Sequence, residues 1–86
     1  MKIKKTIIDV RTPEEFKGGC VTGSKNIPLN EIPDRLDEIK QLDKPILLCC
    51  ASGNRSAQAM TYLHKMGIEC ENGGSWFEVK YLVNKN

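Results

Sequence analysis

The sequence predicts an α/β protein, with a small parallel sheet flanked by helices on both faces. Two observations favour this class. Apolar runs typical of buried strands alternate along the chain with segments of helical periodicity. Residues 45–50 (PILLCC) show no polar alternation, which is typical of a central strand covered on both faces. Ligands of such sheets bind at the carboxyl ends of strands, so the residues after this run are candidates for a site.

The chain opens with a predicted strand and a short helix. Residues 6–10 (TIIDV) form a β-branched run that is typical of a buried strand. Thr12 and Glu15 then have the spacing of a capping box, with a proline at the first helical position between them. Gly18 and Gly19 follow, and we expect them to end this helix.

A second strand and helix are predicted before the central strand. Residues 26–28 are expected to form a very short strand. Asn30 is expected to cap the helix that follows, because asparagine side chains accept hydrogen bonds from helix N-termini. Apolar side chains recur on one face of this segment until Lys44 and Pro45 end it.

The second half of the chain predicts two more helices and one short strand. Residues 56–66 have helical periodicity and end at Gly67. Residues 68–70 are expected to form a strand, and residues 73–74, both glycine, a turn. The last helix is expected over residues 76–83.

Length and composition bound what the protein does. A chain of 86 residues predicts one small domain, residues 1–86. Its formal net charge of +2 is too weak to indicate a nucleic-acid partner. No stretch is apolar enough to span a membrane, and the apolar part of the N-terminus is too short for a signal peptide. We therefore expect a cytoplasmic protein that does not bind membranes.

In a cytoplasmic chain, cysteines indicate metal binding, catalysis or simple burial rather than disulfides. Cys49 and Cys50 are adjacent, Cys20 and Cys70 stand alone, and there is no C-x-x-C pair, so we predict no metal site. Strand alternation points Cys49 away from Cys50 and into the core, and we interpret Cys49 as structural. His64 is predicted to be a surface residue of a helix rather than a ligand or base.

The segment after Cys50 (CASGNR) carries the candidate chemistry. A loop that closes onto a helix N-terminus turns backbone N–H groups inward and adds partial positive charge. Arg55 supplies a full charge and paired donors for an anionic substrate, and Gly53 permits a backbone angle that a side chain resists. These effects favour the thiolate of Cys50, which is the nucleophilic form. The alternative, that Cys50 is a small buried hydrophobe, stays open.

Four motifs, in order along nearly the whole chain, resemble the single-domain rhodanese family. IIDVRTPEEF resembles its first strand and glutamate-rich helix, and GCVTGSKNIPL is similar to its G-H-I-P-G-A-x-N-I-P-L segment. CASGNRS resembles its C-x-x-G-x-R-S active-site loop, and the double glycine at residues 73–74 matches a later one. The resemblance implies a parallel α/β fold and a sulfurtransferase without a cofactor. It assigns Cys50 as nucleophile, and an anion-binding role to Ala51, Ser52, Gly53, Asn54 and Arg55.

The chain departs from the family pattern at three positions. Cys20 and Thr22 stand where the family has histidine and proline, and Trp76 lies closer to the double glycine. Trp76 and Phe77 are expected to pack on the core, with a place in the pocket wall as the alternative.

Asp9 and Arg11 fit the family's opening motif. We expect them to pair with each other or with neighbouring loops in a structural role. We assign them no part in catalysis.

The predicted reaction takes sulfur from a small sulfur-containing anion such as thiosulfate and forms a Cys50 persulfide. The acceptor is cyanide, a thiol or a protein cysteine. One alternative is a persulfide carrier or interaction domain for a specific partner. Another is a phosphatase or arsenate reductase of related fold, disfavoured because Cys50 to Arg55 is C-x4-R rather than C-x5-R. A third is a redox protein that pairs Cys50 with Cys20 or Cys70.

Overall fold

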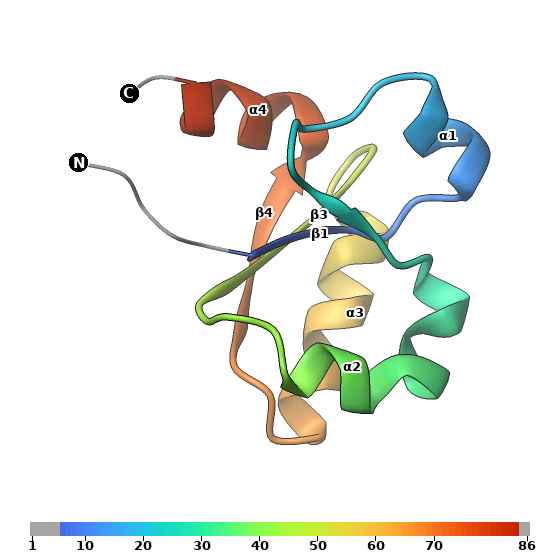
Figure 1. Ribbon diagram of the computed structural model, residues 1–86, viewed down its shortest axis with the longest axis vertical. Helices are drawn as coiled ribbons and strands as arrows, with labels where there is room; N and C mark the ends of the chain where they lie inside the picture. Colours follow the sequence, from blue (N-terminus) through green and yellow to red (C-terminus); the bar gives the residue numbers. More distant parts are fainter. Residues whose placement is uncertain (1–5, 85–86) are drawn as a thin grey trace.

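A computed structural model describes residues 6–84 of the chain (Figure 1). The strands in this range are β1 (Thr6–Asp9), β2 (Lys25–Asn26), β3 (Ile46–Cys50) and β4 (Cys70–Ser75). The helices are α1 (Pro13–Lys17), the 3-10 helix η1 (Leu29–Arg35), α2 (Leu36–Lys40), α3 (Asn54–Lys65) and α4 (Trp76–Asn84). The strands pair in parallel in the order β2-β1-β3-β4. Over residues 6–84, the structure shows no helix with the length and apolarity that a membrane span needs.

Buried side chains pack on both faces of the sheet, as the predicted fold class requires. Leu48 of β3 packs with Ile39 of α2 and Leu63 of α3 on one face. Its neighbour Leu47 packs with Val79 of α4 on the other face. Figure 1 shows the same division, with α2 and α3 below the strands and α4 above them. Every residue of β3 is buried, so the prediction of a central strand covered on both faces is confirmed.

The first helix is confirmed and the second begins differently from the prediction. The capping box of α1 is present, with Thr12 Oγ1 accepting from the N–H of Glu15 and Glu15 Oε1 accepting from the N–H of Thr12. The prediction that Asn30 caps a helix is wrong. The chain instead enters η1 at Leu29, with Pro28 at the N-cap position and no side-chain cap. The N–H of Leu29 bonds to the carbonyl of Val10, so this entry is fixed by the sheet.

The short second strand lies slightly earlier than predicted, at Lys25–Asn26 rather than residues 26–28. Its pairing partners in β1 are Ile8 and Asp9. The strand ends at Asn26, two residues before Pro28, which has no N–H to donate to a neighbouring strand.

The last strand is the largest correction. We predicted a strand at residues 68–70 and a turn at Gly73 and Gly74, but β4 begins at Cys70 and runs through both glycines to Ser75. The N–H of Ile68 bonds to the carbonyl of Leu63 and so belongs to the end of α3. A Cβ on Gly73 would lie 2.7 Å from Val79 Cγ2, so the missing side chain lets α4 pack against the strand.

Candidate active site

The connection from β3 to α3 is tighter than the sequence suggested. Cys50 is the last residue of β3 and Gly53 is the N-cap of α3, with a φ of 101°. A positive φ is readily adopted by glycine and resisted by residues with a Cβ. The helix begins at Asn54 instead of near Ser56, so Asn54 and Arg55 lie in its first turn rather than in a loop.

The sulfur of Cys50 is surrounded by hydrogen-bond donors. Its Sγ accepts from the N–H of Gly53 at 2.9 Å and from the N–H of Ser56 at 3.4 Å, and it lies 3.3 Å from Ser56 Oγ. Burial of Cys50 opposes ionisation, but the bonds from Ser56, Gly53 and Ser52 outweigh it and hold the pKa of Cys50 below that of an ordinary cysteine. Hydrogen-bond donors at the N-terminus of a helix favour the thiolate form of a cysteine.

The other three cysteines have different surroundings. Cys49 is buried on the α4 face of the sheet, where burial and then the Asp9 carboxylate raise its pKa to about 12. Burial also raises the pKa of Cys70, and Cys20 is half-buried. All four thiols are free. The burial of Cys49 agrees with its interpretation as structural.

Arg55, whose paired donors are predicted to bind an anionic substrate, is bonded to a carboxylate of the protein itself. Its Nη1 and Nη2 donate to Glu15 Oε1 and Oε2 of α1 at 2.8 and 3.0 Å, and the two side chains are 33% and 36% exposed. The bonds from Arg55, followed by that from the N–H of Thr12, lower the pKa of Glu15 to about 2. The positive charge of Arg55 is therefore paired with the carboxylate of Glu15, a residue that we did not predict as part of the site.

The predicted anion-binding residues divide into two groups. Gly53 and Ser52 direct backbone N–H groups at the sulfur. The other three do not contact it: Ala51 and Asn54 are exposed around the connection, and Arg55 is paired with Glu15. Two side chains that we did not predict, Ser56 and Asn72, complete the contacts. Ser56 touches the sulfur, and Asn72 of β4 accepts from Ser56 Oγ at 2.7 Å.

Asp9 and Arg11 form the buried ion pair that we expected. Arg11 Nη2 lies 2.7 Å from Asp9 Oδ2 and also donates to the carbonyl of Gly19. The guanidinium lies 4.9 Å from the centre of the Trp76 ring. Trp76 packs on the α4-face core as predicted, but the same prediction is wrong for Phe77, which is 65% exposed and stacks on Trp76.

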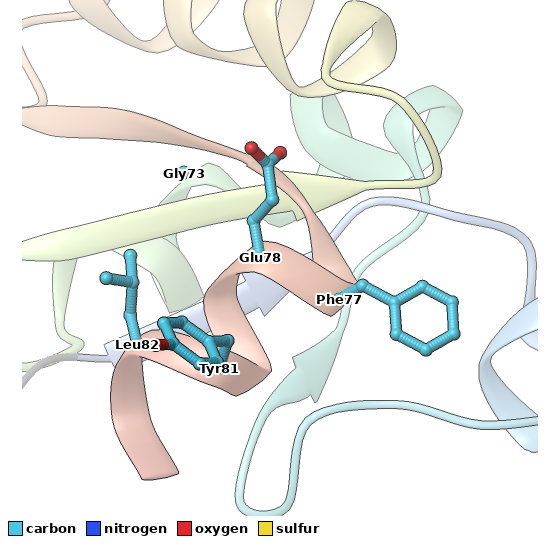
Figure 2. Close-up of a pocket in the computed structure, with 5 residues that line it drawn as sticks. All are labelled: Gly73, Phe77, Glu78, Tyr81 and Leu82. Atoms are coloured by element: carbon cyan, nitrogen blue, oxygen red, sulfur yellow. The ribbon is translucent and has the colours of Figure 1, made fainter. Parts of the chain in front are cut away.

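A groove beside α4 is separate from this site. It has a volume of about 430 Å³ and is lined by Gly73, Phe77, Glu78, Tyr81 and Leu82. Figure 2 shows the side chains of Phe77, Glu78, Tyr81 and Leu82 along α4, with Phe77 directed away from the other three. Neither Cys50 nor a predicted anion-binding residue lines it.

His64 is exposed on α3, as predicted, with Nε2 2.9 Å from the carbonyl oxygen of Cys70. Within residues 6–84, histidine, cysteine and carboxylate side chains form no cluster that would hold a metal ion.

Comparison with known proteins decides the family. The model of the rhodanese-like domain matches residues 1–82. The chain belongs to the rhodanese-like domain family. The match covers every element from β1 to β4 and most of α4, so Cys50 and its donors lie inside the matched residues.

Several known proteins are similar to this rhodanese-like domain. The uncharacterized protein YqhL of Bacillus subtilis is 45% identical over 64 residues, which cover 74% of this chain and 50% of YqhL. The thiosulfate sulfurtransferase PspE of Escherichia coli is 36% identical, covering 78% of this chain and 66% of PspE. The putative sulfur carrier protein YrkF of Bacillus subtilis is also 36% identical, and the match covers 73% of this chain and 34% of YrkF. A solved Escherichia coli rhodanese with anions superposes with a TM-score of 0.79 at 32% identity, covering 87% of this chain and 91% of that one.

The rhodanese-like domain thus spans between a third and two thirds of the length of these three curated relatives. Two of their names state thiosulfate sulfur transfer or putative sulfur carriage. The parallel sheet and the flanking helices agree with the solved rhodanese structure.

Proposed function

We propose that this protein is a sulfurtransferase that moves sulfane sulfur from a small anion such as thiosulfate to a thiophilic acceptor through a persulfide on Cys50. The observation that carries the proposal is the set of donors around the sulfur. The N–H groups of Gly53 and Ser56 point at Sγ, and the pKa of Cys50 is lowered despite complete burial. Similarity to a thiosulfate sulfurtransferase and a putative sulfur carrier supports the same chemistry.

In the first half of the reaction, the Cys50 thiolate attacks the outer sulfur of thiosulfate. An S–S bond forms between Sγ and that sulfur, and the bond between the two sulfur atoms of thiosulfate breaks with its electron pair leaving on sulfite. The products are a Cys50 persulfide anion and sulfite, so the total charge is unchanged. The backbone N–H groups at the start of α3 stabilise the anionic sulfur.

In the second half, an acceptor nucleophile attacks the outer persulfide sulfur. With cyanide the products are thiocyanate and the Cys50 thiolate. With a thiolate the products are a new persulfide and the Cys50 thiolate. The enzyme returns to its starting state, so one transfer is divided into two displacements at sulfur.

Access to the sulfur is set by the residues around it. Cys50 is 0% exposed, so a donor approaches past Ala51, Ser52 and Asn54, which are exposed. Arg55 lies in the first turn of α3, and we propose that its charge attracts the anionic donor even while it is paired with Glu15.

A second candidate function is a persulfide carrier that delivers sulfur to a specific protein partner. The similarity to the putative sulfur carrier YrkF favours it. The Cys50 chemistry is the same, and the difference lies in the acceptor. The phosphatase alternative is disfavoured because the segment from Cys50 to Arg55 is C-x4-R, one residue shorter than the C-x5-R of the phosphatase loop.

The test measures thiocyanate formed from thiosulfate and cyanide by the wild type, Cys50→Ser and Cys20→Ser. We expect turnover in the wild type and in Cys20→Ser and none in Cys50→Ser. A wild-type protein that forms the Cys50 persulfide but transfers its sulfur only to protein thiols, and not to cyanide, would support the persulfide-carrier function. Hydrolysis of an aryl phosphate that is lost in Cys50→Ser would instead support a phosphatase, and loss of sulfur transfer in Cys20→Ser would support the redox alternative.

A further inference from the structure

Asn72 of β4 holds three groups around the candidate nucleophile. Its Nδ2 donates to the carbonyl of Gly53 at 3.1 Å, and its Oδ1 accepts from the N–H of Gly74 at 2.9 Å. A carbonyl only accepts and an N–H only donates, so these two partners fix which end of the amide is oxygen. The same Oδ1 lies 2.7 Å from Ser56 Oγ, and this bond is therefore made with the hydroxyl hydrogen of Ser56.

Ser56 has only one hydroxyl hydrogen for two neighbours. While that hydrogen is on Asn72, the 3.3 Å contact between Ser56 Oγ and Cys50 Sγ is a hydrogen bond only if the thiol supplies the hydrogen. A thiolate has no hydrogen to give. The Ser56 hydroxyl stabilises the thiolate only after it leaves Asn72 and turns to the sulfur.

We propose that Asn72 is a positioning residue that acts through Ser56, competing with the sulfur of Cys50 for the one hydroxyl hydrogen. The proposal rests on the proposed function, because it assigns Asn72 a part in preparing the same nucleophile. When the sulfur carries a proton, Asn72 holds the Ser56 hydrogen. When the sulfur is a thiolate, the hydrogen moves to the sulfur and the bond to Asn72 is lost. Asn72 thereby opposes ionisation of the Cys50 thiol.

The position of Asn72 follows from the sheet. Asn72 pairs with Leu48 and Ser75 with Cys50, and the register shift between these pairs lies beside the site. This irregular end of β4 brings Asn72 next to the first turn of α3. The amide contacts Gly53 and Ser56, two residues that also donate N–H groups to the sulfur.

The competition and a purely structural role for Asn72 predict opposite changes in the pKa of Cys50 when Asn72 is removed. If Asn72 only held the Gly53 carbonyl, its removal would loosen the donors around the sulfur and raise the pKa of Cys50. If Asn72 instead competes with the sulfur, its removal frees the Ser56 hydroxyl hydrogen to bond to the thiolate, and the pKa of Cys50 falls. The direction of the change therefore separates the two roles.

The experiment titrates the Cys50 thiolate by its ultraviolet absorbance, taken as the difference between each variant and its Cys50→Ser counterpart. We expect Asn72→Ala to lower the pKa by roughly half to one pH unit, the equivalent of one ordinary hydrogen bond. Asn72→Asp keeps the acceptor and adds a negative charge, so it should raise the pKa. Asn30 is an exposed asparagine of η1, and Asn30→Ala is the matched control, which should leave the pKa of Cys50 unchanged.

The decisive comparison repeats Asn72→Ala in the Ser56→Ala background. The shift should disappear there, because the hydroxyl through which Asn72 acts is gone. A pKa that rises in Asn72→Ala, or an equal shift in both backgrounds, would overturn the proposal. Thiosulfate labelling of the wild type is run in parallel, so that failure of the proposed function, which appears there, is distinguished from failure of the competition, which appears only in the titration.

Discussion

Arg55 at the start of α3 and Glu15 in α1 form a two-pronged ion pair between residues 40 positions apart in the sequence. The same carboxylate closes the capping box of α1 by accepting from the N–H of Thr12. Glu15 therefore connects the first helix to the first turn of the helix that follows the nucleophile. It also offsets part of the Arg55 charge to which we assign attraction of the anionic donor.

Removing the Glu15 charge should improve the use of anionic donors. In Glu15→Gln the amide oxygen still accepts in the capping box, but Arg55 keeps a charge that is no longer neutralised. We expect the KM for thiosulfate to fall by roughly three- to tenfold at low salt, with the difference fading at high salt. Glu14→Gln, an exposed change of the same charge on the same helix, is the control and should have a smaller effect. An unchanged KM in Glu15→Gln would mean that Arg55 takes no part in donor binding.

The same pair should give stability a pH dependence. The pKa of Glu15 is about 2 in the folded protein, against about 4.3 in an unfolded chain. A depressed pKa means that the contribution is present above about pH 4.3 and is lost as the pH falls through about 2. Because both side chains are about one-third exposed, we expect at most about 1 kcal/mol. Urea unfolding should show the wild type more stable than Glu15→Gln near pH 7 and equally stable near pH 2; a constant difference would contradict this.

The buried pair of Asp9 and Arg11 should matter for stability. Asp9 is 0% exposed and accepts from both the backbone and the guanidinium of Arg11. Asp9→Asn leaves the buried Arg11 charge without its partner, so we expect a loss of about 3–5 kcal/mol in the free energy of unfolding. Denaturant unfolding measures it. A loss below about 1 kcal/mol would show that the carboxylate is not needed to stabilise Arg11.

Two glycines with positive φ allow a matched test of the Cys50 connection. Gly53 has a φ of 101° and Gly67 a φ of 80°, and each alanine substitution should cost about 1–2 kcal/mol in stability. A Cβ on Gly53 would lie 3.4 Å from Gly74 Cα, whereas a Cβ on Gly67 meets nothing within 4 Å. We expect Gly53→Ala to lower sulfur transfer and raise the pKa of Cys50, and Gly67→Ala to do neither. Equal sulfur-transfer activity in the two variants would show that the conformation of Gly53 is not needed for the site.

Local patterns predicted the elements whose partners are close in sequence. The capping box of α1 and the unbroken apolar run of β3 depend on a few adjacent residues, and both were confirmed. The double glycine was misassigned because glycines favour turns unless a neighbouring strand and helix require close approach. Here β3 and Val79 supply that requirement, which the local sequence does not show.

The sequence analysis included Cys50 and Gly53 in the candidate site and missed Glu15 and Asn72. Cys50 and Gly53 were recognisable because an apolar strand leads directly into a glycine-containing connection. Glu15 could have been found from the parallel sheet, since β1 and β3 are adjacent and their following helices begin at the same edge. Asn72 could not, because its position depends on the register shift between β3 and β4.

The most direct test of the central claim is to locate the sulfur taken from thiosulfate. The wild-type protein is incubated with thiosulfate, freed of excess donor and digested, and each cysteine is assigned by fragmentation mass spectrometry. Cys49 and Cys50 are neighbours, so fragmentation between them is required. We predict one additional sulfur atom on Cys50 and none in Cys50→Ser. Sulfur found on Cys49, Cys20 or Cys70 of the wild type, or no added sulfur at all, would contradict a Cys50 persulfide.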